Sequence, residues 1–211
     1  PALPPAGTGG GHTTRLRLPL GDIDPRQALL LADAADAAGA CVRIGIEHDL
    51  YLNGRAPVDV PNELRPWTDA PAIVSCPGST WCEFGIADSR AAAAELLAAG
   101  TIASGTRVCI SGCPNSCAHA AVADIGLTGR LATVGGEKVP AFRLVAGGGN
   151  GKTAGLASEI AAAVPADRAA AAVGAVAEAF REGRANGLTP AQTVAQDREQ
   201  VARAVGAAVG G

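Results

Sequence analysis

The chain has 211 residues and a formal net charge of −3, with 48% hydrophobic, 18% charged and 3% aromatic residues. This charge excludes the broad positive field that binds nucleic acid or an anionic membrane surface, so we expect neither partner. The composition also excludes collagen, coiled coils and wholly disordered chains, and the length allows one globular domain or two small ones.

Residues 1–13 are rich in proline and glycine and contain neither the cationic nor the apolar region of a secretory signal. We expect this segment to be a linker. Because the chain does not begin with Met, we also expect it to be one piece of a longer polypeptide. The most apolar stretches are interrupted by charged residues before they reach the roughly 20 residues that a membrane span requires.

The segment 14–71 predicts a small α+β domain. Asp24 followed by Pro25 is typical of a helix start, and alternating aliphatic and polar residues indicate strands on either side of that helix. The expected elements are a strand at 15–20, a helix at 25–38 and strands at 41–46 and 49–52. Prolines and acidic residues in 57–71 indicate a domain boundary near residue 72.

The segment 72–211 predicts an α/β domain. Short apolar runs indicate strands, and alanine-rich stretches with capping residues, such as Thr189 before Pro190, indicate helices. The expected strands are 72–74, 107–110, 122–127 and 141–145, and the expected helices are 88–99, 153–163, 166–182 and 190–208. A glycine-rich run at 147–153 is only superficially like a phosphate-binding loop, because Ala146 stands where that motif requires its first glycine.

Four of the six cysteines form two close pairs, Cys76 with Cys82 and Cys113 with Cys117. Proline and glycine residues beside each pair hold the backbone in turns and keep the sulfurs out of regular structure. Because one helix and one strand separate the pairs, the two turns can present their thiolates to one soft metal centre.

Disulfides, structural zinc and inert buried thiols are the alternatives to such a centre. An even number of cysteines suits disulfides, although nothing in the sequence signals secretion. The five-residue gap between Cys76 and Cys82 is longer than that of ordinary zinc knuckles. Inert thiols suit Cys41 and Cys109, which lie in expected apolar strands.

Two stretches carry a family resemblance. Residues 76–89 (CPGSTWCEFGIADS) and 111–126 (SGCPNSCAHAAVADIG) resemble the siroheme- and 4Fe-4S-binding motifs of nitrite and sulfite reductases, in the family's order and with its characteristic gap. The chain from about residue 16 to 65 resembles the ferredoxin-like half-domain that precedes those motifs. The resemblance implies an α+β chain, with a ferredoxin-like half-domain at 14–71 followed by an α/β cluster- and siroheme-binding domain at 72–211.

The cofactors implied by the resemblance are a 4Fe-4S cluster and siroheme. Cys76, Cys82, Cys113 and Cys117 would hold the cluster, and the Cys117 sulfur would also be the axial ligand of the siroheme iron. Asn115 would lie against the macrocycle and hydrogen-bond a carboxylate or a cluster sulfur, with an ordinary turn residue as the alternative.

The remaining residues of the two motifs are expected to have structural roles. Trp81 and Phe84 would wall the cluster from water or pack in the core, and His119 would be an ordinary loop histidine. The resemblance assigns no catalytic residue to this chain, because the family's substrate-binding basic residues come from its earlier half. Residues 73–130 agree, since they carry three arginines against four acidic residues and no surplus of positive charge.

The activity implied is six-electron reduction of nitrite to ammonia, or of sulfite to sulfide, by the cluster-bearing C-terminal half of a reductase, and the wording of the motifs leans to nitrite. The implied partners are the substrate, a ferredoxin or NAD(P)H-linked flavoprotein as electron donor, and the N-terminal half or a separate half-subunit. A precorrin-3B synthase-like Fe-S oxygenase and a non-catalytic Fe-S electron-transfer subunit are the alternatives. Thiolate clusters need reducing conditions, so we expect a cytoplasmic protein.

Overall fold

The structure, a computed structural model, describes residues 11–149 and 155–210. The chain divides into two compact units, Pro1–Ala70 and Pro71–Gly211. Most of the expected linker lies outside the described residues, and within it His12 and Thr13 already belong to the first strand. Residues 150–153 of the glycine-rich run likewise lie outside the described residues.

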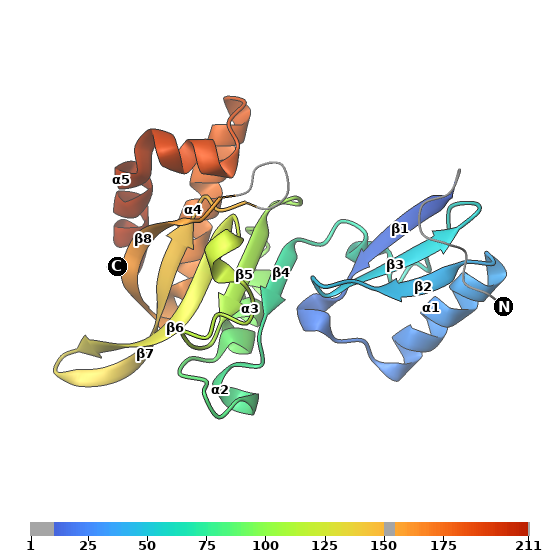
Figure 1. Ribbon diagram of the computed structural model, residues 1–211, viewed down its shortest axis with the longest axis horizontal. Coiled ribbons are helices and arrows are strands. Elements are labelled where there is room, and N and C mark those ends of the chain that lie inside the picture. The colour runs from blue at the N-terminus through green and yellow to red at the C-terminus, as the bar shows by residue number, and fades with distance from the viewer. Residues whose placement is uncertain (1–10, 150–154, 211) are drawn as a thin grey trace. The chain divides into compact units, whose positions relative to one another are not determined.

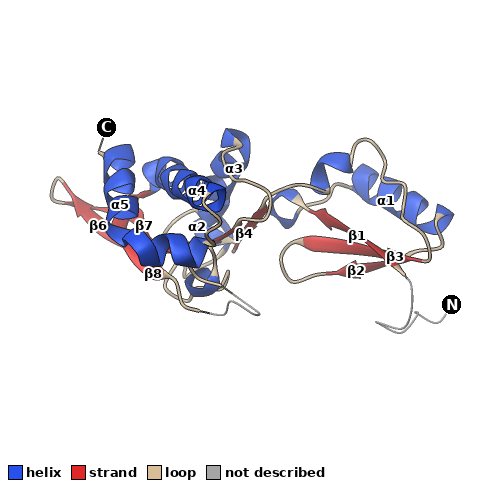
Figure 2. Cartoon of the chain, turned by 90° about the horizontal axis from the view of Figure 1, so that it is seen from above, coloured by secondary structure: helices blue, strands red, loops and turns tan. Residues whose placement is uncertain are grey.

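The first unit is a three-stranded sheet with one helix against it (Figures 1 and 2). The strands are β1 (His12–Arg17), β2 (Cys41–Ile44) and β3 (Asp49–Gly54), and the helix is α1 (Pro25–Ala37). The sheet order is β1–β3–β2, and both outer strands are antiparallel to β3. Strands β1 and β2 therefore run parallel to each other on either side of β3, which is the split β-α-β arrangement of ferredoxin-like folds.

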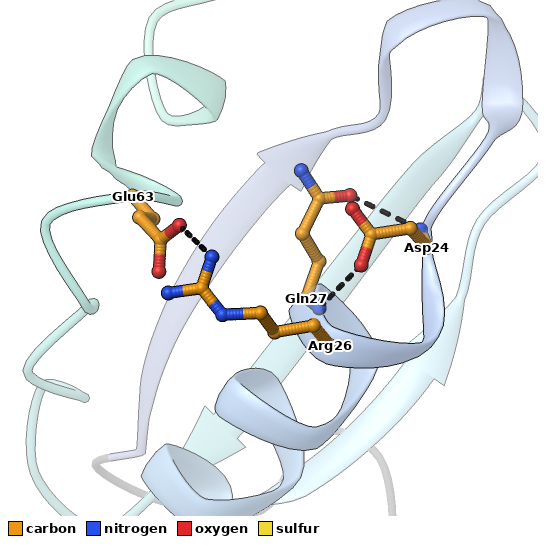
Figure 3. Close-up of polar contacts among 4 residues, drawn as sticks. All are labelled: Asp24, Arg26, Gln27 and Glu63. Atoms are coloured by element: carbon orange, nitrogen blue, oxygen red, sulfur yellow. Dashed lines mark hydrogen bonds and ion pairs between the residues drawn. The ribbon is translucent and has the colours of Figure 1, made fainter.

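A complete capping box begins α1 (Figure 3). The Asp24 carboxylate accepts a hydrogen bond from the backbone N–H of Gln27 at 2.9 Å, and the Gln27 side chain accepts one from the backbone N–H of Asp24 at 3.1 Å. Pro25 occupies the first turn, where its missing N–H costs nothing. This confirms the expected helix start. Beside it, Arg26 Nη1 donates to Glu63 Oε1 at 2.9 Å.

The first β-strand, His12–Arg17, begins and ends three residues before the strand expected at 15–20. It ends at Arg17, and residues 19–21 form a 3-10 turn in which Leu20 has a positive φ of 55°. Pro19 at the start of this turn removes a backbone N–H donor that a continuing strand could use for pairing. A second 3-10 turn, Arg65–Trp67, lies close to the end of the unit.

An apolar core and one buried ion pair stabilise the first unit. The core residues are Leu16, Leu31, Ala35, Leu50, Leu52, Val58, Val60, Leu64 and Trp67. Arg17 and Asp49 lie opposite each other on β1 and β3, with Nε and Oδ1 3.4 Å apart. Arg17 also donates to the carbonyl of Ala70, and the Tyr51 hydroxyl donates to Asp49 Oδ2. Burial, and then this bond to Asp49, raises the pKa of Tyr51 above its ordinary value.

The second unit is built on a five-stranded sheet in the order β4–β5–β6–β7–β8. The strands are β4 (Ala72–Ser75), β5 (Arg107–Ser111), β6 (Ile125–Val134), β7 (Glu137–Ala146) and β8 (Ser158–Pro165). The first three are parallel, and β7 and β8 add antiparallel pairs. The carboxyl ends of β4, β5 and β6 therefore meet at one edge of the sheet.

The α-helices in the described part of this unit are α2 (Gly78–Trp81), α3 (Ser89–Ala99), α4 (Ala169–Ala185) and α5 (Pro190–Val209). Helix α3 connects β4 to β5, and α4 and α5 pack against each other and against β8 (Figure 1). A second capping box, at Thr189, begins α5, as expected. Across residues 11–149 and 155–210, no helix is both long and apolar enough to cross a membrane.

The expectation of a helix at 153–163 is wrong, because residues 158–165 form β8. Alanine favours helix locally, but this segment pairs with β7, whose outer edge would otherwise expose unpaired backbone groups. The short helix α2, between Cys76 and Cys82, was not expected either. The other strands and helices lie where the sequence predicts them, with ends that differ by a few residues and β6 and β7 longer than expected.

Candidate functional site

Both cysteine pairs follow parallel strands at the same sheet edge. Cys76 comes directly after β4, and Cys113 comes two residues after the end of β5. Since Ser75 of β4 pairs with Ile110 of β5, the two chain segments leave the sheet side by side. Cys113 is buried, Cys76 and Cys82 are half-buried, and Cys117 is exposed.

The first loop, residues 76–88, is held by its own hydrogen bonds. The backbone N–H of Cys82 donates to the carbonyl of Gly78, and Ser79 N–H donates to the carbonyl of Ala87. Gly78 has a φ of +67° and packs so closely on the start of α3 that a Cβ would lie 2.7 Å from the Ser89 nitrogen. The turn therefore requires glycine at this position.

Asp88 closes the first loop and caps α3. Its Oδ1 accepts hydrogen bonds from the backbone N–H groups of Arg90 and Ala91, and its Oδ2 accepts one from the Thr80 hydroxyl at 2.7 Å. The bonds from Ala91 and Thr80 hold the pKa of this carboxyl below its ordinary value of 3.8. The negative charge of Asp88 therefore contributes to the loop geometry at neutral pH.

The second loop, residues 112–124, has a backbone strained at two residues. Ser116 has a φ of 54° and His119 a φ of 58°, a left-handed conformation that side chains other than glycine and asparagine rarely adopt. Two hydrogen bonds hold this path: His119 N–H donates to the Ser116 carbonyl, and Ala118 N–H donates to the Ser111 hydroxyl. Asn115 and His119 are exposed.

Gly112 is where the two loops meet. Its carbonyl accepts hydrogen bonds from the backbone N–H groups of Ile86 and Ala87, and its own N–H donates to Cys76 Sγ at 3.1 Å. Strand β6 passes equally closely, since a Cβ on Gly129 would lie 2.1 Å from the Gly112 carbonyl oxygen. Cys76 is thus in contact with the turn that carries Cys113.

The thiols are available as ligands, although they are not gathered into a tight group. All six cysteines are free, and among the described residues no three His, Cys, Asp or Glu side chains are arranged to hold a metal ion. The structure joins the Cys76 and Cys113 turns, and among the hydrogen bonds of residues 11–149 and 155–210 none brings the Cys82 or Cys117 sulfur to them. The donor set suits an iron–sulfur cluster, because thiolates with N–H donors to sulfur are its usual environment.

The two remaining cysteines lie within β-strands, whereas the two aromatic residues of the first motif are exposed. Cys109 is fully buried in β5 with Val74, and Cys41 is half-buried in β2. Trp81 and Phe84 are 78% and 63% exposed, so neither packs in the core of this chain. Two large apolar side chains are therefore exposed within two residues of Cys82 in the sequence.

Sequence reasoning assigned no role to Ser89. This side chain is fully buried at the start of α3, and its hydroxyl donates to the backbone carbonyl of Cys76 at 2.8 Å. A serine directly after the capping residue Asp88 was the only available signal. A separate groove of about 560 Å³ between α4 and α5, lined by residues such as Glu182 and Asp197, involves none of the cysteines.

Comparison with known proteins adds two family matches. Residues 67–193 match the family described as nitrite and sulphite reductase 4Fe-4S domain. Residues 5–64 match the family described as nitrite/sulfite reductase ferredoxin-like half domain. The two matches together span most of the chain.

Two curated relatives and one solved structure are similar to the chain. It is 29% identical over 206 residues to the assimilatory ferredoxin-dependent nitrite reductase of Haloferax mediterranei, covering 88% of the chain and 35% of the relative. It is 26% identical over 176 residues to sulfite reductase (ferredoxin) 1 of Mycolicibacterium paratuberculosis, covering 78% and 30%. The chain thus spans about a third of the length of these relatives. The NirA protein of Mycobacterium tuberculosis shares the fold, with a TM-score of 0.72, 23% identity, and coverage of 96% of the chain and 42% of that protein.

Proposed function

Because this chain belongs to the nitrite and sulphite reductase family, with a 4Fe-4S domain and a ferredoxin-like half domain, we propose that it is the cluster-bearing half of a reductase that converts nitrite to ammonia. The cofactors of the family are a 4Fe-4S cluster and siroheme. When bound, they supply the electrons and the iron on which the substrate is reduced. The observation that carries the proposal is the contact of the two cysteine turns through Gly112.

In this proposal Cys76, Cys82, Cys113 and Cys117 hold the cluster, and Cys117 is shared with the siroheme iron. Cys117 suits the shared role because it is the exposed sulfur of the four. Asn115, also exposed, would lie next to the macrocycle.

The contribution of the chain is to bind and orient the cluster and to restrict water. Cys113 is buried, and the Gly112 N–H already points at the Cys76 sulfur, so part of the ligand shell is formed before loading. The exposed Trp81 and Phe84 would be covered by the rest of the reductase. The unit boundary at Ala70 and Pro71 supports the two-domain organisation.

We propose nitrite as the substrate and ferredoxin as the electron donor. The relative named as a ferredoxin-dependent nitrite reductase matches more of the chain, at higher identity, than the relative named as a sulfite reductase. The basic residues that bind substrate would come from the other half, as a second part of the same polypeptide or a separate subunit. Reducing conditions place such a protein in the cytoplasm.

Anaerobic reconstitution of the full chain tests the cluster. Wild type and the control Cys41→Ser should each contain about four iron atoms and four acid-labile sulfides per chain. Cys82→Ser and Cys113→Ser should lose most of both, because each removes one thiolate ligand. An iron content that stays at the wild-type level in both ligand variants would reject the assignment.

Siroheme and substrate binding are tested separately, by absorption spectra and by titration with nitrite and with sulfite in the presence of the other reductase half. Cys117→Ser should abolish the spectral coupling of haem and cluster. A non-catalytic electron-transfer subunit is the second candidate, since residues 73–130 carry three arginines against four acidic residues and so no surplus of positive charge for an anionic substrate. A chain that takes up the cluster but never siroheme, even beside its other half, would favour that candidate.

A further inference from the structure

Cys76 is fixed at three atoms, and one of its partners is a serine outside the cysteine loops. Its backbone N–H donates to the carbonyl of Ile110 at 3.0 Å, and its Sγ accepts from Gly112 N–H at 3.1 Å. The Ser89 hydroxyl donates to its carbonyl at 2.8 Å and lies 3.4 Å from its Sγ. No other thiol of the candidate site has a sulfur contact of this kind among the hydrogen bonds of the described residues.

The position of the Ser89 hydroxyl is imposed by its surroundings. Ser89 is fully buried and is the first residue of α3, directly after the capping Asp88. Gly78 closes over it, since a Cβ there would lie 2.7 Å from Ser89 Oγ. Burial and the close packing of Gly78 therefore hold the hydroxyl beside the Cys76 sulfur.

Binding of a cluster by Cys76 would change which atom can donate the hydrogen bond between Cys76 and Ser89. In the free thiol, Cys76 S–H can donate to Ser89 Oγ while the Ser89 O–H donates to the Cys76 carbonyl. A ligating thiolate has no proton and can only accept hydrogen bonds. Rotation of the Ser89 hydroxyl then gives the sulfur a second donor in addition to Gly112 N–H.

We propose that Ser89 is a positioning residue that donates a hydrogen bond to the Cys76 thiolate of the loaded cluster and raises the reduction potential of that cluster. The inference rests on the proposed function. The reduced cluster carries one more negative charge than the oxidised cluster, so a donor at sulfur stabilises the reduced form more. The Ser89 hydroxyl is itself fully buried, so water does not compete for this donor.

The test is the midpoint potential of the cluster in the reconstituted full chain, followed by EPR during a redox titration. Ser89→Ala should shift the potential to a more negative value. Ser89→Thr retains a hydroxyl and should keep the potential close to wild type. The matched control is Thr80→Ala, which removes a hydroxyl of the first loop. The Thr80 hydroxyl bonds Asp88 and no sulfur, so this variant should leave the potential unchanged.

Iron and sulfide content distinguishes a failure of the proposed function from a failure of the role proposed for Ser89. If wild type itself assembles no cluster, the proposed function fails and this inference fails with it. If wild type and Ser89→Ala load equally and have the same potential, only the role of Ser89 is overturned. If Ser89→Ala does not load whereas Ser89→Thr does, the hydroxyl acts through the Cys76 carbonyl, which also overturns the bond to sulfur.

Discussion

The backbone N–H of Gly112 donates a hydrogen bond to Cys76 Sγ at 3.1 Å, between residues 36 positions apart in sequence. This bond joins the turn after β4 to the turn after β5. The Gly112 carbonyl adds two bonds to the first loop, from Ile86 and Ala87. One residue therefore fixes the relative position of the two cysteine turns.

Replacing Gly112 by alanine should separate these turns. The added Cβ would lie 2.7 Å from the Ala87 carbonyl oxygen and 2.9 Å from Gly78 Cα, both backbone atoms that cannot rotate away. We expect Gly112→Ala to lower the free energy of unfolding by about 1–3 kcal/mol and to reduce iron loading. Urea denaturation and iron analysis measure the two effects.

Gly206→Ala is the control for that substitution. Gly206 is exposed within α5, and a Cβ there meets no atom within 4 Å. Alanine should raise stability by about 0.5–1 kcal/mol, because it restricts the unfolded chain without a clash. Equal effects of the two alanines on stability would contradict the close packing at Gly112.

The charge of Asp88 should make the stability of the folded chain sensitive to acid. Since its pKa is lower in the folded chain than its ordinary value of 3.8, its stabilising contribution is present above that value and is lost as the pH falls through the folded pKa. Asp88→Asn retains a capping side chain but not the charge. The variant should be less stable at pH 7 and should approach wild type below about pH 4. Urea midpoints of wild type and Asp88→Asn, measured from pH 7 into the acid range, test this expectation. A difference between the two midpoints that stays constant with pH would contradict it.

The capping box of α1 should contribute more to the free energy of unfolding than the Arg26–Glu63 ion pair beside it. Asp24→Ala removes the carboxylate that accepts from the Gln27 N–H, while the backbone N–H of residue 24 can still donate to the Gln27 side chain, and should cost about 0.5–2 kcal/mol. Glu63→Gln removes an ion pair whose side chains are 76% and 48% exposed, and should cost less than about 1 kcal/mol. Thermal unfolding of both variants compares the two costs. A larger loss for Glu63→Gln would reverse this ranking.

The Arg17–Asp49 ion pair should behave differently because it is buried. Asp49→Ala leaves the Arg17 guanidinium buried with the Ala70 carbonyl as its remaining partner, and should cost about 3–5 kcal/mol. Glu159→Ala breaks a half-exposed pair with Arg143 and should cost less than about 1 kcal/mol. Denaturant unfolding monitored by circular dichroism distinguishes the two, and similar costs would show that Asp49 is effectively solvated.

Features that depend on neighbouring residues could be predicted from local sequence patterns. Asp24 and Thr189 begin helices because each caps the turn that follows it, and the motif residues around Cys76 and Cys113 predict the family that residues 67–193 match. Period and capping are local properties of the chain, so a linear pattern is enough to predict them.

Strand β8 and the contacts of Cys76 depend on residues distant in the sequence, so they became evident only from the folded structure. The alanine-rich residues 158–165 form a strand because β7 offers an unpaired edge, which no local pattern reveals. The contacts of Cys76 with Gly112 and Ser89 arise only when parallel strands end side by side and α3 returns beneath them. Hydrogen bonds across 13 and 36 positions follow from packing, because the chain must fold before these atoms can meet.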